Sequence, residues 1–244
     1  MSNEPVLITR SLQKDFGAAP AVVHALNGVD LQVLRGETVA VMGPSGCGKS
    51  TLLHLLGGLE RPSSGEIRVA GQSIGQMSEK ALAHMRRTTV GFVFQAFHLM
   101  DELTAVENVE LPALVAGTSP KAARSRAERL LEQVGLADRA GFLPSALSGG
   151  QKQRVGVARS LINDPVLVLA DEPTGNLDSA ATQEVLKLFD NLRAAGQTLV
   201  LVTHDERIGD NADRVITMRD GEFLDDVRRT DGPRSASLDA EREV

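Results

Sequence analysis

The segment from residue 43 to residue 50 has the spacing of a phosphate-binding loop. It reads Gly43-Pro44-Ser45-Gly46-Cys47-Gly48-Lys49-Ser50 and leads into an apolar run that favours a helix. Glycines let successive backbone N–H groups turn toward one anion, and the start of a helix adds positive potential. Lys49 is expected to reach the terminal phosphates of a nucleotide, and the Ser50 hydroxyl to bind Mg²⁺. We count Thr51 with this loop. A glycine-rich turn with no ligand is disfavoured, because an expected strand precedes the loop.

Two adjacent carboxylates, Asp171 and Glu172, follow an apolar run over 166–170. Side chains alternate along a strand, so the two carboxylates are expected to point in opposite directions. Pro173 disfavours helical geometry at Glu172, which we expect to stay extended. One carboxylate can then hold Mg²⁺ while the other polarises an attacking water, and we assign these roles to Asp171 and Glu172 respectively. Without a phosphate loop, the pair would read as a solvated strand end.

A second segment also combines a hydroxyl with glycines in front of an expected helix. It reads Leu147-Ser148-Gly149-Gly150-Gln151. The serine hydroxyl, the glycine N–H groups and the positive end of the helix would form a second grip for phosphate. The alternative is a serine helix cap and a glycine-rich loop without a ligand. Five fixed residues recur by chance about once in 10⁶ windows at ordinary residue frequencies, which favours a functional motif.

The hydrophobic pattern predicts the framework that positions these motifs. Strands are expected over 6–9, 29–33, 38–42, 66–69, 90–94, 166–170, 199–203 and 215–218. Two of these strands are apolar throughout, which is typical of central strands covered on both faces, and a helical pattern at Val185, Phe189 and Leu192 separates them. This strand–helix–strand unit predicts a parallel sheet. The pattern from about 106 to 161 is helical, and short strands with glycine-rich turns before residue 90 indicate an antiparallel flap.

The composition is that of an ordinary globular chain. Of 244 residues 42% are hydrophobic, and Lys plus Arg 26 against Asp plus Glu 32 gives a net charge of −6. This charge argues against a protein that coats nucleic acid. The single cysteine, Cys47, excludes an internal disulfide framework and a cysteine zinc site, and a reducing compartment is expected. The apolar runs are far shorter than the ~20 residues of a membrane span, and residues 1–20 lack the pattern of a secretory signal.

The segment over 147–151 resembles the signature of ABC-type ATPases, and the other motifs occur in that family's order over about residues 4–225. The resemblance implies an α/β fold: a P-loop NTPase (RecA-like) core with an antiparallel β flap and an inserted α-helical subdomain. It implies a nucleotide-binding domain over 1–226, with the core about 1–95 and 162–226 and the helical subdomain about 96–161. The remaining residues, 227–244, are expected to form a polar tail, and the chain from Asp225 onward to be solvated or frayed.

The resemblance also implies roles for four single residues. Phe16 is similar in position to an aromatic residue that stacks on adenine, and Gln95 to a glutamine that binds Mg²⁺ or water during catalysis. Asp178 is similar to an aspartate beside the nucleotide, and His204 to a histidine that hydrogen-bonds the γ-phosphate and the water. The family usually has Tyr at the position of Phe16, and this chain has neither Tyr nor Trp. The residues alone also permit other interpretations: Phe16 as a core residue, Gln95 as a surface residue and His204 as a structural residue.

In ABC ATPases the signature of one subunit closes over the nucleotide of another. The resemblance therefore implies two ATP molecules, each with Mg²⁺, held between two head-to-tail copies of the chain. Segments over 52–59, 103–112 and 175–178 are similar to the lipoprotein-releasing and macrolide-exporter branch, in which a separate ATPase drives integral membrane permease subunits. This implies a peripheral place on the cytoplasmic face of the inner membrane, with no nucleic acid as partner. A cell-division ABC ATPase, or a soluble ABC ATPase acting on nucleic acid or ribosomes, remains an alternative.

Apolar residues just after Gln95 leave two interpretations open. Phe97, Leu99, Met100 and Leu103 either line a groove that receives a cytoplasmic helix of the permease or pack in the core of the helical subdomain.

Overall fold

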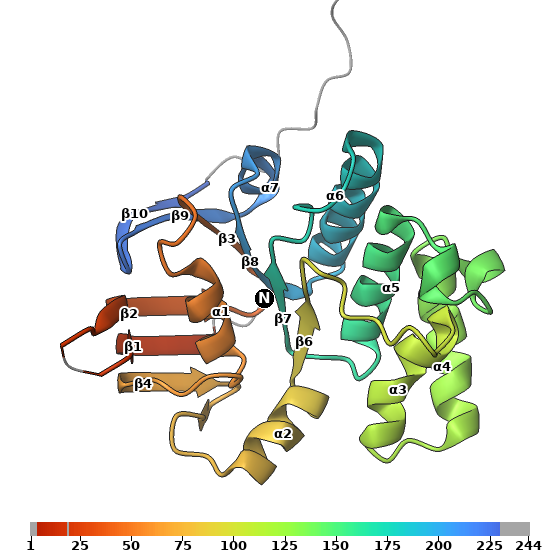
Figure 1. Cartoon of the computed structure of the whole chain (residues 1–244), viewed down its shortest axis with the longest axis horizontal. Coiled ribbons are helices and arrows are strands. Elements are labelled where there is room, and N and C mark those ends of the chain that lie inside the picture. The colour runs from red at the N-terminus through yellow and green to blue at the C-terminus, as the bar shows by residue number, and fades with distance from the viewer. Residues whose placement is uncertain (1–3, 19, 230–244) are drawn as a thin grey trace, which may run out of the picture.

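The computed structural model describes residues 4–18 and 20–229, and ten strands within them form two sheets (Figure 1). The flap sheet contains β1 (Pro5–Phe16), β2 (Val23–Leu34), β4 (Ser64–Val69) and β5 (Gln72–Ser73). The core sheet contains β3 (Thr38–Met42), β6 (Val90–Val93), β7 (Leu167–Asp171), β8 (Thr198–Thr203), β9 (Arg214–Arg219) and β10 (Glu222–Arg228). The flap order is β2-β1-β4-β5, and the core order is β10-β9-β3-β8-β7-β6.

The core sheet is parallel except at its edge, where β10 runs antiparallel to β9. Every residue of β8 is buried, as the uninterrupted apolar run predicts for a central strand. The carboxyl ends of parallel strands meet at one edge of a sheet, which is where ligands of such folds gather. The phosphate loop after β3, the carboxylates after β7 and His204 after β8 therefore meet at one edge.

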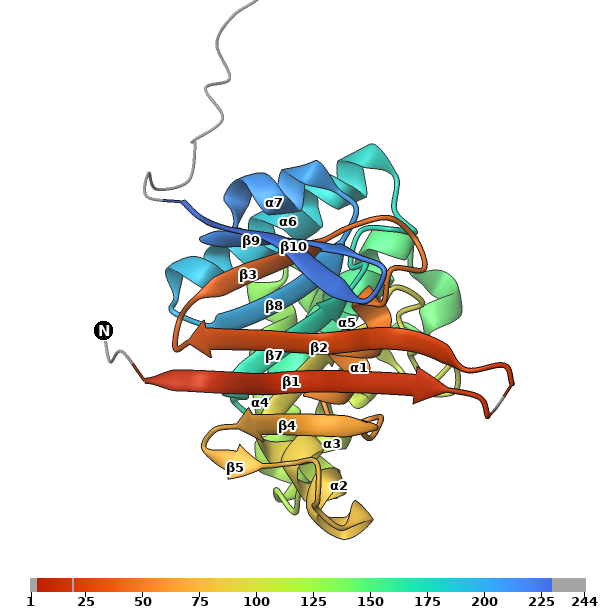
Figure 2. The ribbon, with the colours of Figure 1, turned by 90° about the vertical axis from the view of Figure 1, so that its left-hand side faces the viewer.

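Helix α1 (Lys49–Leu56) lies between the two sheets. Its four leucines are fully buried in a core that also contains residues of both sheets. Figure 2 shows the flap strands in front of the core sheet. Helices α6 (Ser179–Ala194) and α7 (Glu206–Asn211) contribute to a second core together with the other face of the core sheet. The phosphate loop is thus fixed at both ends by buried elements.

A third core belongs to the helices on the right of Figure 1. These are α3 (Ala105–Val115), α4 (Pro120–Gln133) and α5 (Gly149–Leu161), with short turns of 3₁₀ helix at Ala137–Arg139 and Pro144–Ala146. Ala123, Ala127 and Leu131 form the buried stripe of α4, and the chain turns at Gly135, which has φ of 70°. Helix α2 (Glu79–Thr88) precedes β6 and lies against it.

The predicted fold class is confirmed, but one prediction at the C-terminal end is wrong. Asp225, Asp226, Val227 and Arg228 are exposed to solvent, but they are not a frayed tail, because they belong to β10 and pair with β9. The strand is polar because it forms the edge of the sheet, and the carboxylate of Asp226 accepts hydrogen bonds from Arg214. The rest of the predicted tail, residues 230–244, lies outside the described residues. None of the helices in 4–18 and 20–229 combines the length and apolar character needed to cross a membrane.

Candidate nucleotide-binding site

The phosphate loop joins β3 to α1, as its spacing predicts. Gly48 caps the helix with φ of 105°, a conformation that favours glycine. At Gly43 a methyl group would lie 2.1 Å from the carbonyl oxygen of Met218, so only glycine fits there. The ammonium group of Lys49 is buried and donates to the carbonyl oxygens of Gly43, at 2.8 Å, and Pro44, at 3.0 Å. The loop therefore curls around a single cationic side chain, which suits a polyphosphate ligand.

Asp171 lies beside the start of α1. The Ser50 hydroxyl donates to Oδ1 of Asp171 over 3.0 Å. Burial raises the pKa of Asp171 above its usual value, and the hydrogen bond from Ser50 opposes this shift. Mg²⁺ in nucleotide sites is commonly held by one or two such oxygen ligands together with substrate phosphates. The hydroxyl and carboxylate fit that chemistry, and the backbone N–H groups of the loop fit the phosphates.

Glu172 departs from the predicted geometry. Its φ is 42°, so it is left-handed and not extended. The predicted divergence of the two carboxylates is also wrong, because Asp171 contacts Ser50 while Oε1 of Glu172 lies 3.9 Å from Nζ of Lys49, the preceding residue. The backbone N–H of Glu172 donates to the carbonyl of Val202 over 2.9 Å, which fixes the turned conformation. The strained turn therefore directs both acids toward α1.

The other oxygen of Glu172 lies among groups from the end of β8. Nδ1 of His204 is 2.9 Å from Oε2 of Glu172, and the Thr203 hydroxyl donates to the same oxygen over 3.3 Å. The His204 side chain is 68% exposed. The structure thus brings Lys49, Glu172 and His204 into one row. Sequence reasoning missed Thr203, for which only its place at the strand end gave a signal.

Gln95 follows β6 and contacts a neighbouring loop. Its amide nitrogen donates to the side-chain oxygen of Asn176 over 3.4 Å, and the Asn176 amide donates to the Gln95 carbonyl over 3.0 Å. A methyl group on Gly175 would lie 2.7 Å from the Gln95 amide nitrogen. Gln95 is therefore positioned by the loop after Glu172, and its roles toward Mg²⁺ and water stay predictions. The sequence singles out Asn176 only as part of the segment 175–178, which is similar to one branch of the family.

The second glycine-rich segment begins α5 as a capping box. The Ser148 hydroxyl accepts from the N–H of Gln151 over 3.3 Å, and the Gln151 side chain accepts from the N–H of Ser148 over 2.9 Å. A methyl group on Gly150 would lie 2.6 Å from Cβ of Ala181, so glycine permits α5 to approach α6 closely. The helix expected from about Gln151 is present and begins at Gly149, and the contacts of Ser148 are those of a helix cap. No hydrogen bond or ion pair within residues 4–18 and 20–229 joins Ser148 or Gln151 to the phosphate loop.

Asp178 and Phe16 have local partners. The Asp178 carboxylate caps α6 by accepting from the N–H of Ala181 over 2.8 Å, which leaves its role toward nucleotide a prediction. Phe16 ends β1 with 40% of its surface exposed, and Nζ of Lys14 lies 4.7 Å from the centre of its ring. An exposed ring beside a cation suits an adenine base, and that role also stays a prediction.

The apolar residues after Gln95 differ in environment. Leu99 packs against the core of α3, α4 and α5, whereas Met100 is 49% exposed. The core interpretation therefore holds for Leu99 and not for Met100.

A protein-family model described as "ABC transporter" matches residues 26–175. An uncharacterized ABC transporter ATP-binding protein of Thermotoga maritima is 50% identical over 88% of this chain and 92% of its own length. Macrolide export ATP-binding/permease protein MacB 1 of Aeromonas hydrophila is 49% identical over 95% of this chain. This chain spans 36% of that protein, so it matches about a third of its length.

Solved structures agree with the fold. The dimeric post-hydrolysis state of the ATP-binding cassette MJ0796, bound to ADP and Pi, superposes with a TM-score of 0.85 at 37% identity. The match covers 91% of this chain and 98% of that one. A second dimeric structure of MJ0796, titled as a bacterial ABC transporter cassette, gives the same TM-score at 38% identity.

Proposed function

We propose that two copies of this chain close head to tail over two ATP molecules and drive a separate membrane permease. The chain belongs to the ABC transporter family. Binding ATP with Mg²⁺ and hydrolysing it are the general activity of this family's cassettes. The observation that supports this proposal is that one chain has two phosphate-binding segments that lie apart from each other. The phosphate loop and the segment Ser148–Gln151 each begin a helix, yet no hydrogen bond joins them in the described part of the chain.

A second copy can supply the grip that each phosphate loop lacks. The N-termini of α1 and α5 both attract anions. If the α5 terminus of one copy faces the α1 terminus of the other, each ATP is held from both sides. The MJ0796 cassette is dimeric in two solved structures, one of them with ADP and Pi, and this supports the same arrangement here.

The residues at the sheet edge divide the work of hydrolysis in this proposal. Lys49 binds the terminal phosphates, while Ser50 and Asp171 hold the metal, which supplies charge neutralisation at the phosphate oxygens. The Glu172 carboxylate accepts a hydrogen bond from the attacking water and acts as its general base. His204, 2.9 Å from Glu172, orients that carboxylate and the water with its exposed ring. The water oxygen would then bond to the γ-phosphorus in line with the leaving ADP oxygen, the bond from phosphorus to that oxygen would break, and Glu172 would take the proton of the water.

The names of the relatives support a proposal for the type of permease. Several proteins that are 45–49% identical are named as macrolide export ATP-binding/permease proteins. We propose that this permease belongs to the macrolide-exporter and lipoprotein-releasing branch. In this proposal the permease transmits force from the ATPase across the membrane. Association with this permease would place the chain on the cytoplasmic face of the inner membrane.

Mixing two inactive variants tests the head-to-tail arrangement. Lys49→Ala removes the phosphate contact, and Ser148→Arg blocks the second grip with a bulky cation. Each variant alone is expected to lose ATP hydrolysis. In a mixed head-to-tail dimer one site carries both defects and the other carries neither, so mixing is expected to restore hydrolysis. Ser125→Arg, at an exposed position on α4, serves as the matched control and should stay active. A mixture as inactive as its components would overturn the shared site.

A further inference from the structure

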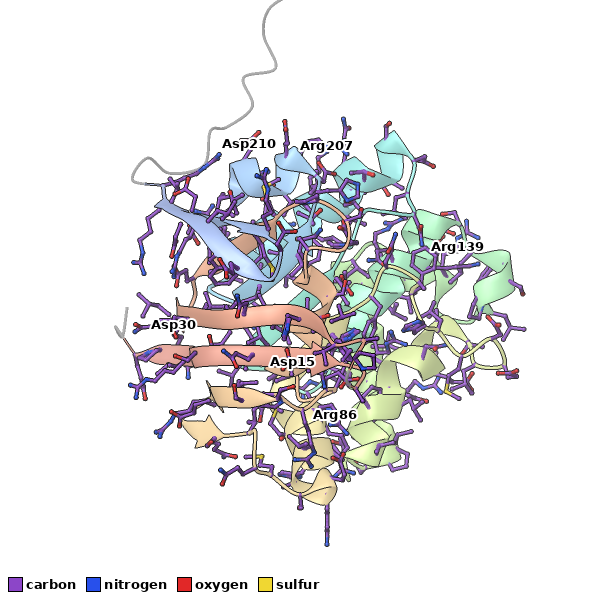
Figure 3. All side chains as sticks on the ribbon, turned by 60° about the vertical axis from the view of Figure 1, so that its left-hand side comes forward. Asp15, Asp30, Arg86, Arg139, Arg207 and Asp210 are labelled. Atoms are coloured by element: carbon purple, nitrogen blue, oxygen red, sulfur yellow. The ribbon has the colours of Figure 1, made fainter. Side chains whose placement is uncertain are left out.

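The hairpin that joins β9 to β10 contacts the phosphate loop. Asp220 and Gly221 form its turn with φ of 49° and 80°, the conformation that a two-residue Asp-Gly turn favours, and Arg219 pairs with Glu222 on either side. The hairpin also lies beside β2 of the flap (Figure 3). The turn therefore touches two parts of the ATP site that are far from it in sequence.

Met218, two residues before the turn glycine of which only Asp220 and Arg219 lie between, packs directly on the loop backbone. It is fully buried. A methyl group on Gly43 would collide with the Met218 carbonyl oxygen, and one on Gly48 would lie 2.8 Å from the terminal methyl of Met218. Because the loop and the strand are packed without free space, a shift of the hairpin toward the loop must move the loop.

Gly221 links the loop to the flap through its own backbone. Its N–H donates to the Cys47 carbonyl over 3.0 Å, and its carbonyl accepts from the N–H of Asn27 over 2.9 Å. A trans peptide is planar, so the Cys47 carbonyl and the Gly48 N–H, which share one peptide group, point in opposite directions. With the carbonyl held by the hairpin, the Gly48 N–H points away from it. One hydrogen bond therefore sets the direction of a donor that the loop offers to phosphate.

A side-chain contact holds the turn against the flap. The Asn27 amide donates to the Glu222 carboxylate over 2.6 Å. Both side chains are exposed, so this contact adds little to the stability of the fold. At the other end of β10, Arg229 donates to Asp210 of α7, which Figure 3 labels, over 3.0 Å. The hairpin is thus fixed at both ends, and Glu222 is the side-chain anchor beside Gly221.

We propose that the β9–β10 turn is a positioning element of the ATP site. Gly221 sets the orientation of the peptide between Cys47 and Gly48, and Glu222 holds Gly221 in place through Asn27. The proposal rests on the binding of ATP by the phosphate loop, and it needs neither a second copy nor a permease. A hairpin with a purely structural role would affect folding alone. A positioning role also affects the affinity for a ligand that consists only of phosphates.

Two glycines in similar turns separate backbone strain from phosphate binding. Gly71, between β4 and β5, has φ of 77° after Ala70 at 48°. A methyl group there meets nothing within 4 Å, whereas one on Gly221 would lie 2.9 Å from the Ala25 carbonyl oxygen. In calorimetry, Gly221→Ala is expected to weaken binding of inorganic triphosphate and of ATP by the same factor, roughly tenfold, as the loss of one hydrogen bond to a charged group does. Gly71→Ala has the same strain and should bind both ligands as the wild type does.

Glu222 provides a second test that introduces no backbone strain. If charge alone mattered, removing this carboxylate would strengthen the binding of an anion. We expect the opposite for Glu222→Ala, a loss of roughly threefold in triphosphate affinity, because the contact with Asn27 is lost. Glu222→Gln removes the same charge but keeps an oxygen that can accept from the Asn27 amide, so it should retain the wild-type affinity. In steady-state hydrolysis, KM for ATP should rise by the same factors with little change in kcat.

Each comparison can overturn the proposal. Equal triphosphate affinity in Gly221→Ala and Gly71→Ala overturns the role of Gly221, and equal affinity in Glu222→Ala and Glu222→Gln overturns that of Glu222. Both results leave ATP binding by the chain intact. If the wild type binds neither triphosphate nor ATP, the proposed function falls as well. Thermal unfolding shows whether each variant folds, and if Gly221→Ala does not, the comparison at Glu222 decides alone.

Discussion

Replacing Glu172 by Gln is expected to stop ATP hydrolysis and leave ATP binding intact. The substitution keeps the size of the side chain and removes its charge. The amide oxygen can still accept from the Thr203 hydroxyl, which now lies 3.3 Å from the carboxylate. Under the proposed assignment, what is lost is the carboxylate that accepts the proton of the attacking water. The geometry thus separates the role in catalysis from the role in folding.

The two effects can be measured separately. General-base assistance contributes about 10²–10⁴ in rate, which corresponds to roughly 3–5 kcal/mol of barrier. The ion pair between Glu172 and Lys49 spans 3.9 Å and stands at the outer limit for such contacts. Because the two side chains are only 7% and 15% exposed, removing one charge can cost up to about 3–5 kcal/mol of stability, which the hydrogen bonds that Lys49 keeps to Gly43 and Pro44 reduce. Turnover should therefore fall by at least about a hundredfold, and urea titration of the variant separates this loss from any change in stability.

Three measurements check this prediction. Phosphate release gives kcat, calorimetry gives the ATP affinity, and light scattering during size-exclusion chromatography gives the mass in the presence of Mg–ATP. We expect a large drop in kcat, an ATP affinity close to that of the wild type, and accumulation of ATP-bound dimers. Glu184→Gln, at a mostly exposed carboxylate on α6, serves as the control. Unchanged turnover in Glu172→Gln would refute the assignment of Glu172 as the carboxylate that activates water.

Three further predictions follow from other contacts. Gly43→Ala should lower the free energy of unfolding by about 1–3 kcal/mol in urea titrations, because the new methyl would lie 2.1 Å from the Met218 carbonyl oxygen; an unchanged midpoint would contradict the tight fit. The hydrogen bond from Arg214 lowers the pKa of Asp226 below 3.8, so this carboxylate stabilises the fold above its unfolded pKa and the contribution is lost as pH falls through the lower folded pKa. Asp226→Asn should thus cost at most about 1 kcal/mol at neutral pH, since the side chain is 42% exposed, and progressively less as the pH falls below 3.8; a loss of equal size at neutral and acid pH would contradict this. Phe16→Ala should weaken ATP binding roughly tenfold in calorimetry while sparing inorganic triphosphate, because stacking on a base contributes about 1–3 kcal/mol; an equal loss for both ligands would contradict stacking.

The phosphate loop could be predicted from the sequence because its function depends on local geometry. The strand before it, β3, has the bounds that its apolar run predicts, and α1 begins within the motif. Local pattern also predicted a helix from about Gln151, and α5 begins two residues earlier, at Gly149. The contact between Glu172 and His204 could not be predicted in this way, because it joins residues from two strands and depends on the register of β7 and β8.

The misses in the fold have a common physical origin. The flap strands β1 and β2 each extend well past the apolar segments that predicted them. Bulges shift the register between these strands at several points. Apolar and polar residues therefore do not alternate with the period of two that predicts a strand. Strand β10 has one half-buried residue, Phe223, and is otherwise exposed. A strand at the edge of a sheet needs no apolar face, and its sequence therefore reads like a tail.

Left-handed backbone at residues other than glycine occurs in two groups and at two isolated positions of the described residues. Ala70 and Asp220 each precede a glycine with positive φ, the pattern of tight hairpin turns that requires it at both positions. The isolated positions are Ser11, at a register shift of β1, and Asp164, in the turn after α5. Phe97, His98 and Glu172 form the second group and precede no such glycine.

Turn chemistry therefore does not account for the second group. Their conformations are fixed from outside, by the Arg159 guanidinium on the carbonyls of Phe97 and His98 and by the Val202 carbonyl on the N–H of Glu172. Strain of about 1–3 kcal/mol per residue persists only where surrounding contacts over-determine it. Here those contacts come from α5 and β8. Any movement of α5 relative to the core sheet must then change the turn after Gln95, which links the position of the helical region to the geometry of the ATP site.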